Sequence, residues 1–146
     1  MGLVTDIIFV RALKSNAELL AMLPSGDIYN TSIALPDEDI YNAPIPYIIV
    51  SRGPVTNDTS TKDGYEGEYD NVNISVQIAA KNRRELGTIS GMVRETIKDF
   101  FENLTDDDDD YSLVPLDYQF SAQNVNYDSM KPCYWEELNY QCDTNV

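Results

Sequence analysis

Apolar side chains recur every three or four positions in residues 5–23, and this period predicts an amphipathic helix. One apolar row comprises Phe9, Leu13, Ala17 and Leu20, and a second comprises Ile8, Ala12, Leu19 and Leu23. Because the two rows together are wider than one seam, the helix is expected to be buried on two sides. The sequence SNAE at 15–18 resembles a capping box, so the segment is expected to divide into two helices there.

A second helical period begins after Asn82 and runs to about Leu104. Its apolar positions step by three and four residues, at Leu86, Ile89, Val93, Ile97, Phe100 and Leu104. Asn82 is a favourable N-cap residue, and Glu85 follows three residues later. Gly87 and Gly91 lie off the apolar stripe, where each costs the helix about 1 kcal/mol relative to alanine. Either another backbone, such as that of a second subunit, approaches this face closely, or a stable helix tolerates both glycines.

Alternating apolar and polar residues predict strands between and after the helices. Residues 71–80 (NVNISVQIAA) alternate most clearly, so one face of this strand is expected to be buried and the other solvated. Residues 46–52 form a shorter β-branched strand. In the C-terminal part the best pair of strands is about 116–127 and 133–142, joined near 128–132.

The remaining segments are rich in turn-forming residues. Residues 27–45 are expected to be irregular, and residues 53–70 are expected to form a long polar loop of a length that is usually functional or disordered. The resulting order of elements is α-β-β-α-β-β. It predicts a single α+β domain over residues 1–146, with an antiparallel sheet of about four strands packed against two main helices.

The charge balance is strongly acidic, with 25 Asp and Glu, ten Lys and Arg, and a net charge of −15. Binding to nucleic acid or to an anionic membrane needs clustered basic residues, so both are disfavoured. No apolar run of 18 residues occurs, and the first residues match neither a signal peptide nor a myristoylation motif. Cys133 and Cys142 are nine residues apart, so on one strand they would lie about 30 Å apart on opposite faces. Two free thiols are therefore expected.

Few residues suited to catalysis are present. Histidine is absent, which removes the commonest general base and the commonest zinc ligand. Phosphate-binding glycine motifs and the nucleophile-elbow motif are absent as well. The run Asp106, Asp107, Asp108, Asp109 and Asp110 lacks EF-hand spacing. It suits a solvated loop, a weak cation site or a surface facing DNA or a basic partner. We expect no enzymatic activity, no cofactor and no resident metal ion.

Four aromatic residues near the C-terminal end, Tyr127, Tyr134, Trp135 and Tyr140, suit either of two roles. Aromatic residues are common in strands, so they fit ordinary sheet packing. A cluster of this kind could equally form a ligand platform.

Several features occur together in a fixed order along residues 3–104. An N-terminal helix is followed by Asp27-Ile28-Tyr29, then by the strand Pro46-Tyr47-Ile48-Ile49-Val50, a polar loop, the alternating strand 71–80 and a long amphipathic helix. This layout resembles the tail-terminator and tail-completion proteins of long-tailed bacteriophages and prophages. The C-terminal part matches that family more loosely.

The resemblance implies a small α+β protein that forms a hexameric ring on the head-proximal end of the tail tube. Such a ring stops tube polymerisation and offers a docking surface to the head–tail connector, without a cofactor or turnover. The implied partners are copies of the chain itself, the tail tube protein and connector proteins, in a virion assembled in the bacterial cytoplasm. Relatives of similar fold also occur as other head–tail connector or neck components.

Two further classes compete with this reading. An acidic DNA-mimic inhibitor would spread carboxylates over one extended face to bind a basic enzyme. A metal-dependent hydrolase would have to use the Asp106–Asp110 run, without histidine and without separated, inward-facing carboxylates.

Two sets of residues are candidates for the assembly. As subunit contacts we expect Ile8, Ala12, Leu19, Gly87, Gly91, Asp63, Tyr65 and Glu66. As an acidic lining of the ring opening we expect Glu66, Glu68, Asp70, Asp106, Asp107, Asp108, Asp109 and Asp110. A negative lining would repel the phosphate backbone, so passing DNA would not be bound.

Overall fold

The computed structural model describes residues 4–30, 44–58, 69–104, 115 and 117–145. Within these ranges the helices are α1 (Thr5–Lys14), α2 (Ala17–Ala21) and α3 (Arg83–Asn103). The strands are β1 (Tyr29–Asn30), β2 (Tyr47–Asp58), β3 (Tyr69–Ala80), β4 (Asp117–Ala122), β5 (Asn126–Asp128) and β6 (Cys133–Asn145).

The described strands form one sheet with the order β1-β2-β3-β6-β4, and β5 pairs with the first residues of β6. β1 runs parallel to β2, whereas the other pairings are antiparallel. The α+β class is confirmed, but the expected detail of four strands and two helices is wrong. β1 and β5 have only two and three residues, which is too short for alternation to reveal them.

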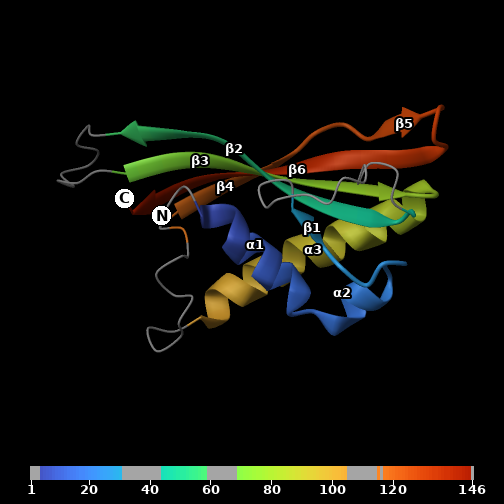
Figure 1. Ribbon diagram of the computed structural model, residues 1–146, viewed down its shortest axis with the longest axis horizontal. Coiled ribbons are helices and arrows are strands. Elements are labelled where there is room, and N and C mark those ends of the chain that lie inside the picture. The colour runs from blue at the N-terminus through green and yellow to red at the C-terminus, as the bar shows by residue number, and fades with distance from the viewer. Residues whose placement is uncertain (1–3, 31–43, 59–68, 105–114, 116, 146) are drawn as a thin grey trace.

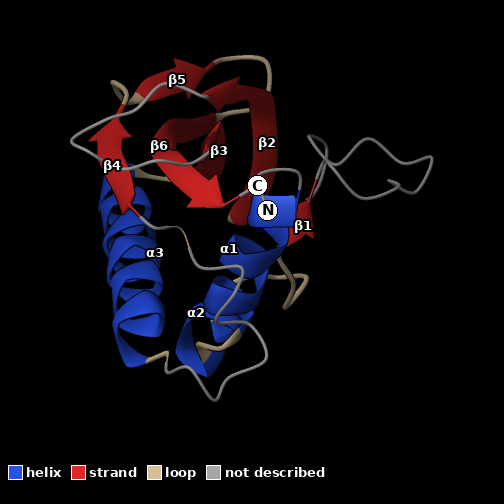
Figure 2. Ribbon diagram, turned by 90° about the vertical axis from the view of Figure 1, so that its left-hand side faces the viewer, coloured by secondary structure: helices blue, strands red, loops and turns tan. Residues whose placement is uncertain are grey.

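Helices α1 and α3 lie against one face of the sheet, and no described helix covers the other face (Figure 1, Figure 2). The apolar helix-facing residues of β3 are fully buried: Val72, Ile74, Val76, Ile78 and Ala80. They belong to one apolar cluster with the stripe of α3 and both apolar rows of the N-terminal helices, apart from Ala17, which is exposed. Full burial of a valine or isoleucine side chain contributes about 1.5–3 kcal/mol, so this layer is the main source of stability.

The N-terminal helical segment divides where the sequence predicts a break. Asn16 adopts an extended backbone conformation, and its side-chain oxygen accepts hydrogen bonds from the backbone N–H groups of Glu18 and Leu19, at 3.0 and 3.2 Å. Its side-chain nitrogen donates to the hydroxyl of Thr96 on α3 at 2.9 Å. Asn16 is therefore the N-cap of α2 and also fixes the turn against α3. Ser15 instead donates to the carbonyl of Ala12.

Strand β2 continues well beyond the expected end at residue 52. Its register with β3 shifts between Arg52 and Val55, so a bulge takes up Gly53 and Pro54. A Cβ atom on Gly53 would lie only 3.1 Å from the carbonyl oxygen of Asn73, so glycine suits this close approach of two backbones. The expected loop 53–70 is wrong at both ends, because its flanks pair as β-ladder. Residues 59–68 lie outside the described residues.

The two cysteines occupy one strand, β6, and contribute to different faces of the sheet. Cys142 belongs to the main core, whereas Cys133 packs with Tyr47, Ile49 and Ala79 in a second buried cluster. Both thiols are free and buried. The expectation of two unpaired cysteines is confirmed. Among the described helices none is long and apolar enough to cross a bilayer.

Candidate interaction surfaces

The apolar row expected to contact another subunit lies inside the fold. Ile8, Ala12 and Leu19 each have 0% of their surface exposed. They pack in the main core, which includes residues of α3 and of the sheet. The wide apolar arc of the N-terminal segment is thus satisfied within one chain. The prediction that these three side chains form a subunit contact is wrong for this structure, because they offer no surface to a partner.

Gly87 and Gly91 lie on the exposed side of α3. A Cβ atom built on either glycine meets no other atom within 4 Å. Within the part of the chain that the structure describes, no other backbone therefore approaches this face closely. A role in a contact between subunits stays a prediction.

Most residues of the expected acidic lining lie outside the described ranges, and so do the expected subunit contacts in the polar loop 53–70. These are Asp63, Tyr65, Glu66, Glu68 and the run Asp106–Asp110. Asp70 is described and lies near the start of β3. One of its carboxylate oxygens accepts a hydrogen bond from the side chain of Asn57 on β2, at 3.3 Å.

The sheet face opposite the helices carries rows of polar side chains. Position by position in the register, β3 contributes Asn71, Asn73, Ser75 and Gln77, β6 contributes Asp143, Gln141, Asn139 and Glu137, and β4 contributes Asp117, Gln119 and Ser121. Side chains of neighbouring strands are linked by hydrogen bonds, from Asn71 to Asp143 at 3.0 Å and from Ser75 to Glu137 at 2.7 Å. The alternation in 71–80 predicts this solvated face correctly, and the structure shows that two more strands extend it.

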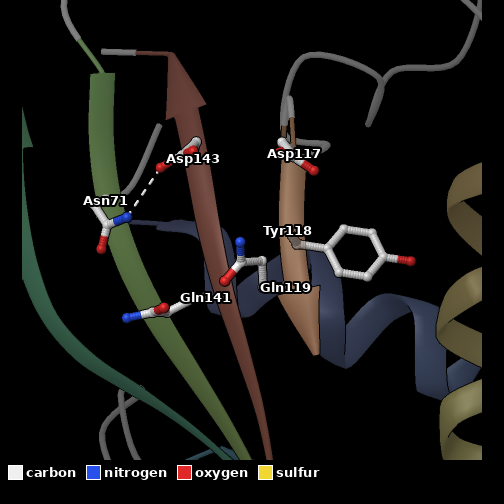
Figure 3. A pocket seen from close by; sticks show the side chains of 6 residues that line it. All are labelled: Asn71, Asp117, Tyr118, Gln119, Gln141 and Asp143. Atoms are coloured by element: carbon white, nitrogen blue, oxygen red, sulfur yellow. Dashed lines mark hydrogen bonds between the residues drawn. The ribbon is translucent and has the colours of Figure 1, made fainter. Parts of the chain in front are cut away.

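Two shallow hollows run along this polar face. The first, of about 190 Å³, is lined by Asn71, Asp117, Tyr118, Gln119, Gln141 and Asp143. We call it the sheet-end hollow. The second shares Gln119 and Gln141 with the first and continues toward Asn139. Figure 3 shows that Asp117 and Asp143 occupy neighbouring strands at one end of the sheet, with Asn71 reaching Asp143 from β3.

The chemistry available in the sheet-end hollow is limited to two carboxylates, amides and one phenol. Asp117 and Asp143 are direct cross-strand neighbours. No group of three or more His, Cys, Asp or Glu residues that could hold a metal ion occurs among the described residues. The hollow also lacks a nucleophile paired with a base, which acyl or phosphoryl transfer would require. Its carboxylates and amides can receive a cationic or hydrogen-bonding group.

The four C-terminal aromatic residues do not form one platform. Tyr140 is 1% exposed and packs in the main core, where its ring centroid lies 5.1 Å from that of Phe9 and 5.2 Å from that of Phe120. Trp135 belongs to the second cluster on the opposite face. Tyr127 stacks at 5.1 Å on Tyr134 and is 57% exposed. Sheet packing therefore accounts for Tyr140 and Trp135.

Burial makes both thiols poor nucleophiles. It raises the pKa of Cys142 to about 12, and the carboxylates of Asp143 and Asp117 add to this rise. Burial also raises the pKa of Cys133, and Asp128 contributes in the same direction. Since the thiolate is the reactive form, neither cysteine is prepared for catalysis at neutral pH.

No protein-family model matches the chain, and no curated protein matches it either.

Proposed function

We propose that this protein is a structural, non-enzymatic subunit of a bacteriophage tail, one that forms a ring at the head-proximal end of the tail tube and joins it to the head connector. The observation that carries the proposal is the uncovered polar face of the long β3–β6–β4 sheet. No described helix covers this face over residues 71–77 of β3, 137–143 of β6 and 117–121 of β4, so it can contact other subunits or solvent there, whereas near Ala79 and Cys133 it is buried in the second cluster.

The character of this face supports a passive role. Its side chains are mostly amides and hydroxyls, some of which form hydrogen bonds between strands. Its charged residues, among them Asp117, Glu137 and Asp143, are acidic. A polar surface with negative charge does not release counterions from DNA, so it does not bind the phosphate backbone. This property is useful where genomic DNA must pass a protein wall without adhering.

The charge of the whole chain supports the same role. Six copies, the number implied by the family resemblance, would carry 6 × −15, or −90, around one opening. The described carboxylates Asp70, Asp117 and Asp143 lie at one end of the sheet, Asp117 and Asp143 on the polar face and Asp70 on the face that carries Val72. We propose that this end faces the ring opening; the other expected lining residues, Glu66, Glu68 and Asp106–Asp110, lie outside the described residues. As the alternative function, another head–tail connector or neck component would use the same surface.

The test is removal of the gene from the viral genome, followed by electron microscopy of the particles. Without a terminator we expect tails of abnormal length that carry no heads, and supply of the wild-type protein from a plasmid should restore normal particles. Antibody labelling of restored particles should mark the junction between head and tail. Normal, head-bearing virions in the deletion strain would refute the proposal.

A further inference from the structure

Basic residues cluster on the outward side of α3. Arg83, Arg84, Gly87, Gly91, Arg94 and Lys98 fall within an arc of about 100° at 3.6 residues per turn, and all six are exposed. We call this set the α3 basic face. Its four charges are a large share of the ten Lys and Arg in a chain of net charge −15. Of the acidic residues of the same helix, Glu102 falls at the edge of this arc and Glu95 about 20° beyond it, whereas Asp99 lies further round, in a hollow lined by Ser15 and Asn16.

Most of these charges have no partner among the described residues. Arg83, Arg84 and Lys98 form no ion pair or side-chain hydrogen bond there. Arg94 lies with its guanidinium 4.2 Å from the centre of the Phe120 ring, an interaction that leaves the edge of the guanidinium free to donate hydrogen bonds. The two glycines between these residues leave bare helix backbone, so a partner surface can come close while the flanking basic side chains reach around it.

The sheet-end hollow has the complementary character. Asp117 and Asp143 face each other across β4 and β6, and like charges directly opposite on neighbouring strands destabilise a sheet. Neither carboxylate forms an ion pair with a Lys or Arg in the described part of the chain. Asn71 donates one hydrogen bond to Asp143, which leaves most of the acceptor sites of the pair open. A guanidinium group from outside would relieve the repulsion and could bind in a bidentate manner.

The sheet-end hollow and the beginning of the α3 basic face, at Arg83 and Arg84, lie toward opposite ends of one molecule, whereas Arg94 further along the helix packs on Phe120 of β4 in the same chain. The hollow is at the start of β3, near Asn71, whereas α3 begins directly after the end of β3, at Arg83 (Figure 1). The strand between them, residues 71–80, spans roughly 30 Å at about 3.3 Å per residue. The beginning of the α3 basic face therefore cannot reach the hollow of its own chain. Two complementary patches at different ends of identical subunits produce a head-to-tail contact, which closes into a ring or continues as a filament.

We infer that the α3 basic face of one copy docks on the sheet-end hollow of a second copy of this chain, with the guanidinium groups of Arg83 and Arg84 directed at Asp117 and Asp143. The occupant is a second copy because charge complementarity is provided by the chain itself, in which both halves of the contact are present. The inference rests on the proposed function only for the closure of this contact into a ring.

The contact is tested with two charge-reversed forms of the full chain. The helix form carries Arg83→Glu and Arg84→Glu, and the hollow form carries Asp117→Lys and Asp143→Lys. Each form alone presents like charges at the contact, so its self-association, measured by sedimentation velocity at low ionic strength, should be at least about tenfold weaker than that of the wild type. An equimolar mixture should associate again, because the reversed helix meets the reversed hollow and the two unaltered surfaces also meet.

Matched controls use charge reversals away from both surfaces. Lys14→Glu at the end of α1, where Lys14 pairs with Asp27, and Glu18→Lys on α2 both change exposed residues, and neither change should alter self-association. Circular dichroism and urea unfolding establish that every form is folded. Association of the wild type should weaken with added salt, as expected for exposed charges.

Three results would overturn the inference: a wild type that stays monomeric at millimolar concentration and low salt, reversed forms that associate like the wild type, or a mixture that does not regain association. The proposed function is judged separately, by complementation of the gene deletion. If the mixture recovers while the deletion leaves virions normal, the contact stands and the tail function fails. If the deletion abolishes virions but the reversed forms assemble normally, the tail function stands and this contact fails.

Discussion

Replacing Tyr140 by phenylalanine should stabilise the protein, which is an unusual expectation for a fully buried residue. Tyr140 is 1% exposed, and its hydroxyl group has no hydrogen-bond partner among the described residues. Its ring packs on Phe9, Tyr118 and Phe120. The Tyr140→Phe change keeps these ring contacts and removes only the oxygen.

The magnitude follows from the desolvation of that hydroxyl group. A buried polar group without a partner costs about 1–3 kcal/mol, so Tyr140→Phe should raise the free energy of unfolding by an amount up to this range. Tyr118→Phe is the matched control, because Tyr118 belongs to the same ring cluster but is only partly buried. Its hydroxyl is expected to be solvated, and the control should change stability by less than about 0.5 kcal/mol.

A pH series provides a second readout of the same group. Burial raises the pKa of Tyr140 above the ordinary value of 10.0, and the neighbouring Tyr118 adds to this. The unfolded chain therefore loses its tyrosine proton first, so the wild type should lose stability as pH rises above about 10. Cys142, whose pKa is raised from 9.0 to about 12, contributes a loss of the same sign between these values. The advantage of Tyr140→Phe should consequently grow with pH above about 10.

The assay is equilibrium unfolding in urea, with an unchanged denaturant slope as the criterion that the same surface is exposed. A Tyr140→Phe variant that is less stable than the wild type by about 1 kcal/mol would refute the reasoning, since that is the net value of a made hydrogen bond. The hydroxyl would then have a partner, such as a buried water molecule.

Three further predictions concern stability and reactivity. Gly91→Ala should raise the free energy of unfolding by about 1 kcal/mol, because the position is exposed in the middle of α3 and has open space around it; a loss of stability in urea unfolding would contradict this. Asn16→Ala should lower the free energy of unfolding by about 1–2 kcal/mol, because the change removes both the cap of α2 and the hydrogen bond to Thr96. Asn82→Ala removes one capping hydrogen bond and should lower the free energy of unfolding by less. Cys133 and Cys142 should resist a thiol reagent in the native protein at pH 8 and react only on unfolding, because both are buried and have raised pKa values; rapid native labelling detected by mass spectrometry would show that one thiol is accessible.

The sequence predicts the elements whose stabilising contacts are local. The long periods of α3 and β3 are recovered almost to the residue, because each has one apolar face that repeats regularly over ten or more residues. The cap at Asn82 is recovered for the same reason, since its hydrogen bond to Glu85 is made within one turn. The placement of the two cysteines on opposite faces follows from the period of a strand alone.

The parts that the sequence does not predict depend on contacts between distant segments. β1 exists only because two residues pair with Ile49 and Val50 of β2, and the bulge at Gly53 is defined by its partner Asn73. The same limit applies to the candidate surfaces. The width of the apolar arc in residues 5–23 is predicted correctly, but the sequence does not tell whether the second side packs on the same chain or on another.

The opposed carboxylates of Asp117 and Asp143 illustrate the limit most clearly. Their opposition depends on the register between β4 and β6, which the sequence does not provide. A signal was nevertheless present, since polar residues at 117, 119 and 121 alternate as those at 139, 141 and 143 do.

The position of β6 in the sheet has a consequence for the order in which the protein folds during synthesis. β6 follows every other described element along the chain, yet it pairs with β3 on one side and with β4 and β5 on the other. Until its residues leave the ribosome, β4 and β5 have no strand to pair with, and β3 presents an open edge with its alternating apolar row. Such an edge is prone to pairing with the wrong chain. The nascent protein should therefore be most dependent on chaperones, and most sensitive to slow translation, in the interval between the synthesis of β3 and that of β6.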